Sequence, residues 1–411
     1  RLRRSQLTRR QMDLPIYMDG HATTRVDPRV IEAMLPFFGE YYGNAASRHH
    51  RFGWTVRDAV ADARAEVAAL VGAPARDLVF TSGATESNNL AVKGVAEAAR
   101  NRGNHIVTAR TEHRAILDPC ARLEQQGMRV SYLSVGNDGV LDPAALEAAI
   151  TPTTVLVTVM MANNEIGVLQ PIAALARLAR ARGVAFHTDA AQAAGKVPID
   201  VEADGIDLLS LTAHKLYGPK GVGALFIRHG VAVAPLVDGG GHEGGLRSGT
   251  LNVPAIVGFG RAAAICADEM PGEAARLSRL RDRLWDGIRR SLRGVTVNGS
   301  MRARLPHNLN ISVDGLHGEQ LLMGLDDVAV SSGAACTSAS REPSHVLRAL
   351  GLGDTRARAS IRFGLGRFNT EAEVDYVIEK LCSLVTRLRA PTPVFDLAED
   401  DRNLPPKWRV Y

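Results

Sequence analysis

The feature that most restricts the fold of this chain is a regular alternation of short β-branched runs with longer helical stretches. Helical periodicity rich in Ala, Leu and Arg occurs at residues 55–71, 86–100, 115–126, 143–150 and 172–182. Seven β-branched runs follow or separate these stretches, at residues 78–82, 105–109, 130–134, 155–162, 184–188, 208–212 and 223–228. This alternation predicts an α/β fold in which helices cover a mainly parallel sheet. Ligands of such sheets bind beyond the carboxyl ends of the strands, so the residues after each run are the candidates for chemistry.

The pattern changes after about residue 260. A long charged helix is predicted at about 273–292, strands near 308–313 and 360–364, and a last helix from Glu371. We therefore expect four regions: a basic arm at 1–15, a large domain at 16–265, a smaller α+β domain at 266–390, and a tail at 391–411. Within the smaller domain, the sequence SSGAACTSAS predicts a mobile loop at 331–341.

The excess of positive charge is confined to the amino terminus. The chain has 411 residues with 49 Lys and Arg against 44 Asp and Glu, but residues 1–10 contain five Arg and no acid. The remainder is balanced, which argues against nucleic acid as the main ligand. We interpret the first residues as a solvated arm, with a remnant of an organellar presequence as the alternative.

The four cysteines, at positions 120, 266, 336 and 382, are widely separated and form no CxxC motif. This spacing predicts neither a resident metal site nor a disulfide framework, and scattered thiols fit a reducing compartment. We therefore expect a cytoplasmic protein, with the mitochondrial matrix as the second choice. The longest apolar stretch, around 155–162, is far shorter than the roughly 20 residues of a membrane span, so no membrane association is expected. Cys120, Cys266 and Cys382 lie in helical stretches and are predicted to be core thiols.

Lys215 and Asp189 are the first candidates for chemistry, because each follows a predicted strand. A lysine at this position could form a Schiff base with a carbonyl cofactor once its pKa falls; the alternative is a solvated lysine at a strand end. Asp189 could hold a protonated pyridine nitrogen, and Gln192, three residues later, could reach the phenolic oxygen of the same ring. Asp189 could equally cap the next helix.

The segment TSGATESNN at 81–89 predicts a strand, a glycine turn and a helix start. Free backbone N–H groups there suit a phosphate, although capping alone would explain Thr85 and Glu86. It matches neither common nucleotide-binding glycine motif. His113 follows another strand and could stack on a flat cofactor and move protons, although a lone histidine is more often structural.

Cys336 and Arg362 are the candidates in the smaller domain. A thiol on a mobile loop can act as a nucleophile that moves between two sites, the alternative being an incidental surface cysteine. Arg362 lies in a predicted strand, where it could be exposed or could turn inward to hold a carboxylate with both nitrogens.

Together these segments strongly resemble the cysteine desulfurases, which are fold-type-I pyridoxal 5′-phosphate enzymes of the class-V aminotransferase family. The resemblance runs from about residue 16 to 388, and the motifs that carry it are ATTRVDPRV, TSGATESNNLAVKG, TEHRAILD, NNEIGVLQP, HTDAAQAAGKVPIDV, HKLYGPKGVGAL, RSGTLNVP, SSGAACTSAS and SIRFGLGRF. The long cysteine segment resembles the group that serves housekeeping iron–sulfur assembly and nitrogen fixation. The fold implied is a large domain with a seven-stranded sheet, and a small domain to which the amino-terminal segment contributes.

The resemblance implies roles for individual residues. Lys215 carries the cofactor as a Schiff base, Asp189 partners the pyridine nitrogen, Gln192 contacts the phenolic oxygen, and His113 stacks on the ring. The phosphate is held by Ala84, Thr85, Thr212 and His214, and by Thr250 of the opposite subunit in a homodimer. Asn164 lies beside cofactor and substrate, and Arg362 takes the substrate carboxylate. Cys336 accepts the sulfur.

The activity implied is conversion of L-cysteine to L-alanine, with the sulfur held on Cys336 as a persulfide. The expected acceptors are an iron–sulfur scaffold protein and other sulfur carriers, and Cys336 is expected to ligate a nascent cluster only transiently. Selenocysteine lyase, an aminotransferase of the same fold and a catalytically silent binding protein remain alternatives. Intact Lys215, Asp189, His113 and Cys336 argue against the last.

Three departures from the family pattern stand out. His21 replaces the more usual Asn before ATT, and Gly244 stands where Arg is common. The tail after Pro391 is only loosely similar to the family's scaffold-docking end, which leaves the identity of the partner open.

Overall fold

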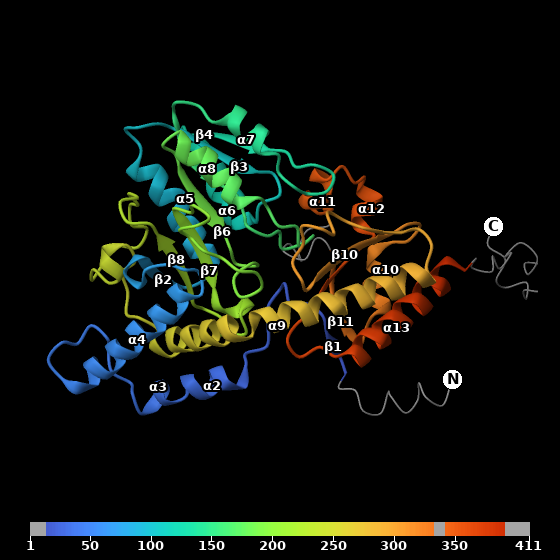
Figure 1. Cartoon of the computed structure of the whole chain (residues 1–411), viewed down its shortest axis with the longest axis horizontal. Helices are drawn as coiled ribbons and strands as arrows, with labels where there is room; N and C mark the ends of the chain where they lie inside the picture. Colours follow the sequence, from blue (N-terminus) through green and yellow to red (C-terminus); the bar gives the residue numbers. More distant parts are fainter. Residues whose placement is uncertain (1–13, 333–341, 391–411) are drawn as a thin grey trace, which may run out of the picture.

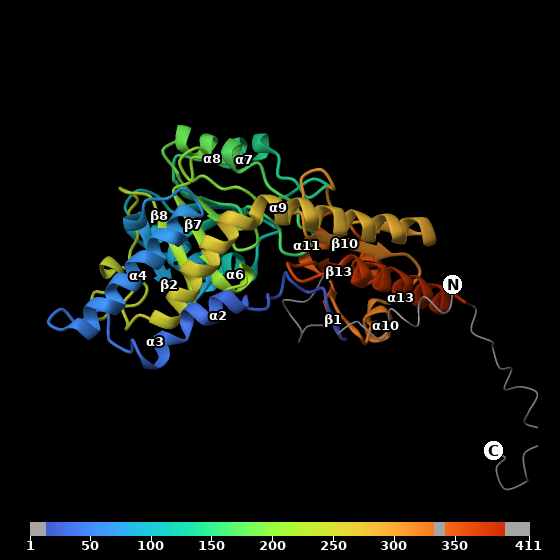
Figure 2. The same ribbon diagram turned by 60° about the horizontal axis from the view of Figure 1, so that its bottom comes forward.

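The computed structural model describes residues 14–332 and 342–390. Residues 1–13 of the basic arm, residues 333–341 of the predicted loop with Cys336, and the tail at 391–411 lie outside the described residues. In Figures 1 and 2 a larger α/β region lies at one end of the molecule and a smaller sheet with its helices at the other, with one long helix running between them.

The larger region is built on a seven-stranded sheet of order β2-β8-β7-β6-β5-β3-β4. The strand bounds are β2 (Leu78–Thr81), β3 (His105–Ala109), β4 (Arg129–Leu133), β5 (Thr154–Thr158), β6 (Ala185–Asp189), β7 (Leu208–Thr212) and β8 (Gly223–Ile227). Strand β8 runs antiparallel to both of its neighbours, β2 and β7, and the other strand pairs of this sheet are parallel. All seven predicted strands are therefore confirmed, and the mainly parallel sheet with them.

Helices cover both faces of this sheet, which is why its central strands are almost entirely buried. Apolar side chains of α5 (Ala84–Ala98) and α6 (Arg114–Gln125) pack on one face. Those of α4 (Arg51–Ala69), α7 (Pro143–Ala149) and α8 (Ile172–Ala181) pack on the other face. Two short helices, α2 (Pro28–Met34) and α3 (Pro36–Gly39), precede α4.

The smaller region is an antiparallel sheet of order β12-β13-β10-β9 flanked by helices. Its elements are β9 (Val295–Val297), β10 (Asn308–Val313), α10 (Gly318–Gly324), β11 (Val328–Ala329), β12 (Ser331–Ser332), α11 (His345–Ala349), α12 (Asp354–Arg358), β13 (Ser360–Gly364) and α13 (Glu371–Arg389). β1 (Ile16–Tyr17) pairs in parallel with β11, so the amino-terminal segment joins this region as expected.

Helix α9 (Val253–Ser291) joins the two regions and begins about twenty residues before the predicted charged helix. The Asn252 side chain caps it, and its first half is apolar and buried against the larger core. Only the charged half of α9 was predicted from the sequence, because the buried half lacks the amphipathic pattern of a surface helix. The larger core includes Cys266, whereas the second core begins at Leu277 on the same helix. We retain the domain division near residue 265 as a proposal, with the boundary inside α9.

Two smaller expectations can also be compared with the structure. Cys120 and Cys266 are buried as predicted. Cys382 on α13 packs against the core of the smaller region but is partly exposed, so the prediction of a core thiol is only partly confirmed for it. No helix within residues 14–332 and 342–390 is long and apolar enough to cross a membrane.

Candidate active site

A cavity of about 560 Å³ opens where the carboxyl ends of the central strands face the smaller region. Ten residues singled out from the sequence line it: Ala84, Thr85, His113, Asn164, Asp189, Gln192, Thr212, His214, Lys215 and Arg362. Thr250 is exposed and lies outside this cavity. Cys336 lies outside the described residues.

One end of the cavity is formed by the turn between β2 and α5. Gly83 has φ 153°, a backbone conformation that glycine adopts without strain, and its Cα lies close to Gly223 on β8. The helix that follows is 15 residues long, and its first N–H groups, at Ala84 and Thr85, have no partner within the helix. Thr212, at the end of β7, lies beside the turn. Backbone donors, a hydroxyl and a helix N-terminus make this end suited to a phosphate.

His214 lies at the same end and stays uncharged at neutral pH. Burial, followed by the positive charges of Lys215 and Lys220, lowers the pKa of His214 to about 4. Its Nδ1 is 3.1 Å from the Thr23 hydroxyl. A neutral imidazole offers a hydrogen bond to an anion without adding a full charge.

Asp189, the last residue of β6, also lines the cavity. Its Oδ2 accepts a hydrogen bond from Asn88 Nδ2 at 2.7 Å, and its Oδ1 accepts one from the Ala191 backbone at 2.9 Å. Each carboxylate oxygen can accept a further bond. Burial, reinforced by the charge of Asp189, raises the pKa of nearby Glu112 well above its usual range. Asp189 lines the cavity, whereas Glu112 does not.

Lys215 lies in a 3₁₀ turn, Ala213–Lys215, directly after β7. Its ammonium group contacts the backbone carbonyl of His21 and donates to that of Ala22 at 2.9 Å. The amino-terminal segment thus closes over the lysine from the side of the smaller region.

His113 caps α6 and is fixed in one tautomer. Its Nδ1 accepts a hydrogen bond from the Ala115 backbone at 3.1 Å, so in the neutral ring the proton is on Nε2. Burial lowers the pKa of His113; Asp189 acts in the opposite direction and Lys215 lowers it further. The ring therefore presents an Nε2–H donor at neutral pH.

Arg362, on β13, is 1% exposed and turns into the cavity wall. Its Nη1 donates to the Asn164 carbonyl at 3.0 Å and its Nη2 pairs with Asp19 Oδ1 at 2.7 Å. Its Nε has no hydrogen-bond partner among the described residues. The inward orientation that the sequence left open is therefore the one adopted, with a carboxylate already bound to one nitrogen.

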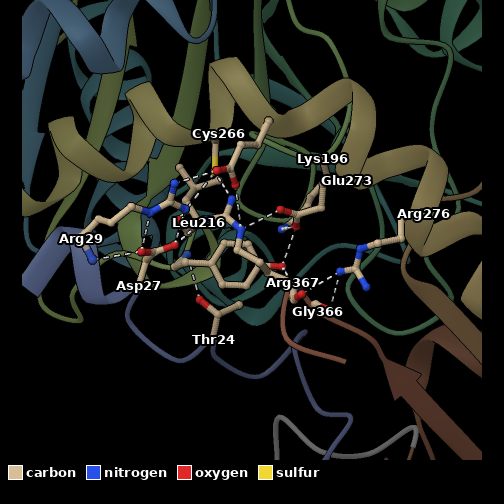
Figure 3. Close-up of polar contacts among 12 residues, drawn as sticks. Thr24, Asp27, Arg29, Lys196, Leu216, Cys266, Glu273, Arg276, Gly366 and Arg367 are labelled. Carbon is tan, nitrogen blue, oxygen red and sulfur yellow. Dashed lines mark hydrogen bonds and ion pairs between the residues drawn. The ribbon is translucent and has the colours of Figure 1, made fainter. Parts of the chain in front are cut away.

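A second polar group lies behind the Lys215 turn and consists of Asp27, Lys196, Tyr217, Glu273 and Arg367. We call these five residues the sealed cluster; Figure 3 labels Asp27, Lys196, Glu273 and Arg367. Glu273 Oε1 accepts from the Tyr217 hydroxyl at 2.7 Å and from Lys196 Nζ at 3.2 Å, and Glu273 Oε2 accepts from Arg367 Nε at 2.8 Å. Arg367 also pairs with Asp27 at 2.7 Å. Tyr217 has φ 62°, so these contacts hold a left-handed residue two positions after Lys215.

The cavity matches the chemistry of pyridoxal 5′-phosphate. Its donors at the α5 turn suit the phosphate, and Asp189 suits a protonated ring nitrogen. Lys215 supplies the amine that a carbonyl cofactor requires. The sequence profile of the family described as "Aminotransferase class-V" matches residues 16–377. The chain belongs to this family.

Relatives place the chain among the cysteine desulfurases of the class-V aminotransferase family. It is 56% identical over 395 residues to "Cysteine desulfurase IscS" of Anaeromyxobacter dehalogenans, covering 96% of this chain and 98% of the relative. It is 49% identical over 403 residues to the protein of the same name from Rickettsia peacockii, covering 97% and 98%. These enzymes depend on pyridoxal 5′-phosphate, and so does this one.

Solved structures agree with this assignment. A structure titled "NIFS-LIKE PROTEIN" superposes with a TM-score of 0.85 at 38% identity, covering 91% of this chain and all of the other. DndA from Streptomyces lividans superposes with a TM-score of 0.73 at 39% identity, covering 84% and 97%. The fold-type-I architecture expected from the sequence is therefore confirmed.

Several residues of this cavity were not predicted from the sequence. Asn88 binds Asp189 from one turn inside α5, and Lys220 lines the cavity next to His214. His21 was noted only as a departure from a motif, yet it lines the cavity as well. Asn88 was within reach of sequence reasoning, because it lies four residues after Ala84 and so on the same face of the helix.

Proposed function

We propose that this cavity converts L-cysteine to L-alanine and that Cys336 accepts the sulfur. The observation that carries the proposal is that Lys215, Asp189 and Arg362 line one cavity, in a chain about half identical to cysteine desulfurases over nearly its full length. When bound, pyridoxal phosphate supplies an electron sink that stabilises negative charge at the substrate α-carbon.

The residues of the chain divide the remaining tasks. Lys215 holds the cofactor and moves the α-proton at Nζ, while Asp189 keeps the ring nitrogen protonated. His113 stacks on the ring and donates from Nε2. Arg362 binds the substrate carboxylate through nitrogens not committed to Asp19.

The phosphate is bound by the remaining residues at the α5 turn. Ala84 and Thr85 donate from the helix N-terminus, Thr212 and His214 add side-chain donors, and Asn164 lies between cofactor and substrate. Thr212 and Asn164 are buried, which strengthens the hydrogen bonds that they make, whereas Thr85 is exposed at the start of α5.

The sulfur transfer is balanced without an external oxidant. The Cys336 thiolate attacks the substrate sulfur and forms an S–S bond, the Cβ–S bond breaks, and its electron pair takes up a proton at Cβ. The products are alanine and a persulfide on Cys336. The role of Cys336 rests on the sequence and its resemblance alone.

The test is to incubate the holoenzyme with L-cysteine, to assay alanine, and to weigh the peptide that contains Cys336. We expect alanine and one added sulfur atom on that peptide, and the loss of both in Cys336→Ser. Cys382→Ser is the matched control, because Cys382 is partly exposed but lies on α13, away from the cavity lining. Unchanged alanine production in Cys336→Ser would contradict the mechanism. Parallel assays with selenocysteine decide which amino acid is preferred.

A homodimer is part of the proposal. Large aromatic side chains are exposed on α3 and around the start of α4, where Phe38 is 65% and Tyr42 67% exposed, and the Tyr42 ring packs on Phe52. An apolar surface of this kind is typical of an interface. Thr250 is exposed outside the cavity of its own chain, as expected of a residue that serves the site of a second copy. Sedimentation of Tyr42→Glu, expected to be monomeric and to bind the cofactor more weakly, tests this.

The partners and compartment follow from the same resemblance. We propose that an iron–sulfur scaffold protein and other sulfur carriers receive the persulfide sulfur in the cytoplasm. Among the described residues no group of three or more His, Cys, Asp or Glu could hold a metal ion. Transfer of radiolabelled sulfur from the loaded enzyme to purified acceptor proteins is the direct measurement.

A further inference from the structure

A chain of hydrogen bonds runs from the smaller region to Gln192. Its first member is Arg304, whose side chain can only donate hydrogen bonds. Arg304 Nη1 donates to Asn308 Oδ1 at 2.8 Å, and a guanidinium cannot accept a hydrogen bond. The Asn308 oxygen therefore faces Arg304, and its nitrogen faces the other way. That nitrogen lies 3.2 Å from the Glu165 carbonyl and 2.9 Å from His21 Nε2.

The second step fixes the proton of His21. The ring is 1% exposed, and burial, followed by the neighbouring His307, Arg362 and Lys215, lowers the pKa of His21 well below its usual range. A neutral ring carries one proton. Since Asn308 donates to Nε2, that proton is on Nδ1, which lies 2.9 Å from Gln192 Oε1. His21 is therefore the donor and Gln192 Oε1 the acceptor.

The third step fixes the amide of Gln192. With its oxygen bound to the His21 ring, its nitrogen lies on the opposite side and donates one N–H to the His21 carbonyl at 3.0 Å. The amide nitrogen has a second N–H. Gln192 and His21 both line the cavity that contains Lys215.

We propose that His21 is a positioning residue, which orients the Gln192 amide so that its second N–H faces the phenolic oxygen of the cofactor. The inference rests on the proposed function only because that function places the Gln192 amide beside the phenolic oxygen of the cofactor. It assigns a purpose to the histidine at which this chain departs from its family's motif.

The orientation matters because the two ends of an amide have opposite effects on a phenolate. An N–H stabilises the negative oxygen, and so favours loss of the proton that this oxygen shares with the Lys215 nitrogen. Without that donor the proton is held more tightly. The pH midpoint of the visible absorbance change of the holoenzyme then moves upward.

The test compares two ring substitutions at neighbouring positions. His21→Phe keeps a flat ring but removes both nitrogens. His307→Phe is the matched control, because His307 stacks on His21 at 4.4 Å and is equally buried, yet it makes no hydrogen bond to Gln192. We expect His21→Phe to raise the midpoint by several tenths of a pH unit to about one unit, and His307→Phe to leave it unchanged.

A double-mutant cycle separates positioning from general damage. In a Gln192→Leu background, His21→Phe should cause no further shift, because the amide it orients is gone. A shift that persists in this background, or an equal shift in His307→Phe, would overturn the proposal. So would a His21→Phe variant that melts earlier with an unaltered absorbance titration.

A second pair of variants covers a failure of His21→Phe to fold. His21→Gln and His21→Met have side chains of equal length, but only the glutamine can donate to Gln192 Oε1. We expect the glutamine variant to restore the midpoint and the methionine variant to shift it, and identical titrations of the two would refute the assignment. The titration uses no substrate. Absence of alanine production would therefore reject the proposed function without touching this result.

Discussion

Two polar regions flank the Lys215 turn, and they use the same residue types in opposite ways. The cavity contains Lys215, Asp189 and Arg362, whereas the sealed cluster contains Lys196, Glu273 and Arg367. In the sealed cluster Glu273 accepts three hydrogen bonds, from Lys196, Tyr217 and Arg367, and Arg367 also pairs with Asp27. In the cavity Asp189 accepts only two from described residues, and Arg362 Nε has no partner among them.

The difference teaches how buried charges divide between structure and chemistry. Burial lowers the pKa of Lys196, but Tyr217 and Glu273 outweigh it, so the pKa of Lys196 is raised and the ammonium is held charged. A charge satisfied on every side positions its neighbours and has no capacity left for a ligand. A charge with spare bonding capacity in a cavity is available to a cofactor or substrate.

The largest expected effect separates the two lysines. Lys215→Ala should lower the rate of alanine formation by roughly 10³-fold or more, because it removes the group to which we assign cofactor binding and proton transfer. It should leave the free energy of unfolding of the apoprotein nearly unchanged. Rates and chemical denaturation measured on the same preparation test both statements. A Lys215→Ala enzyme that retains a tenth of the activity would remove the distinction between the regions.

The sequence placed the cavity well and did not find the sealed cluster at all. Lys215, Asp189 and Thr85 follow strands whose β-branched runs are visible locally, and parallel strands bring their carboxyl ends to one edge. The members of the sealed cluster come from positions 27, 196, 217, 273 and 367, each in a segment with no local signal for pairing. Only tertiary packing, including the unpredicted first half of α9, brings them together.

The second prediction concerns stability. Lys196→Met removes one partner of a buried pair and leaves Glu273 with less compensation, so the free energy of unfolding should fall by about 3–5 kcal/mol. Urea denaturation of the apoprotein measures it. The control is Arg100→Ala, which breaks an exposed pair with Glu97 and should change stability far less. Equal losses in the two variants would show that the sealed cluster adds nothing to stability.

The third prediction uses two arginines five residues apart. Arg362→Lys keeps the charge but loses the planar pair of donors, so KM for L-cysteine should rise roughly 10- to 100-fold with a smaller change in kcat. Arg367→Lys should leave KM nearly unchanged and lower the melting temperature, because its guanidinium bridges Glu273 and Asp27. Steady-state kinetics and thermal melts of both variants test whether KM changes in Arg362→Lys and the melting temperature changes in Arg367→Lys. A rise in KM in Arg367→Lys but not in Arg362→Lys would contradict the assignment of substrate binding to Arg362.

The fourth expected effect is a pH dependence, and it has opposite form for two buried glutamates. Burial raises the pKa of Glu165, beside the cavity residue Asn164, to about 7, although Ser344 and Arg362 act in the opposite direction. Burial acts to raise the pKa of Glu273 as well. The positive charges of Lys196 and Arg367 outweigh burial, so the pKa of Glu273 is lowered overall. In the unfolded chain both ionise near pH 4.5.

The sign of each effect follows from which state binds more protons. Between about pH 4.5 and 7 the folded protein holds the Glu165 proton more tightly than the unfolded chain, so this group makes stability fall as the pH rises. Glu165→Gln should remove that loss. The difference in free energy of unfolding between the variant and the unaltered protein should therefore move in favour of the variant from pH 5 to pH 7 and stay constant above pH 7. Glu273→Gln should show a constant deficit over the same range, because the contribution of Glu273 is fully present above pH 4.5 and disappears only below it. Urea denaturation at pH 5, 6, 7 and 8 distinguishes the two, and parallel pH profiles would mean that the two regions treat a buried carboxyl alike.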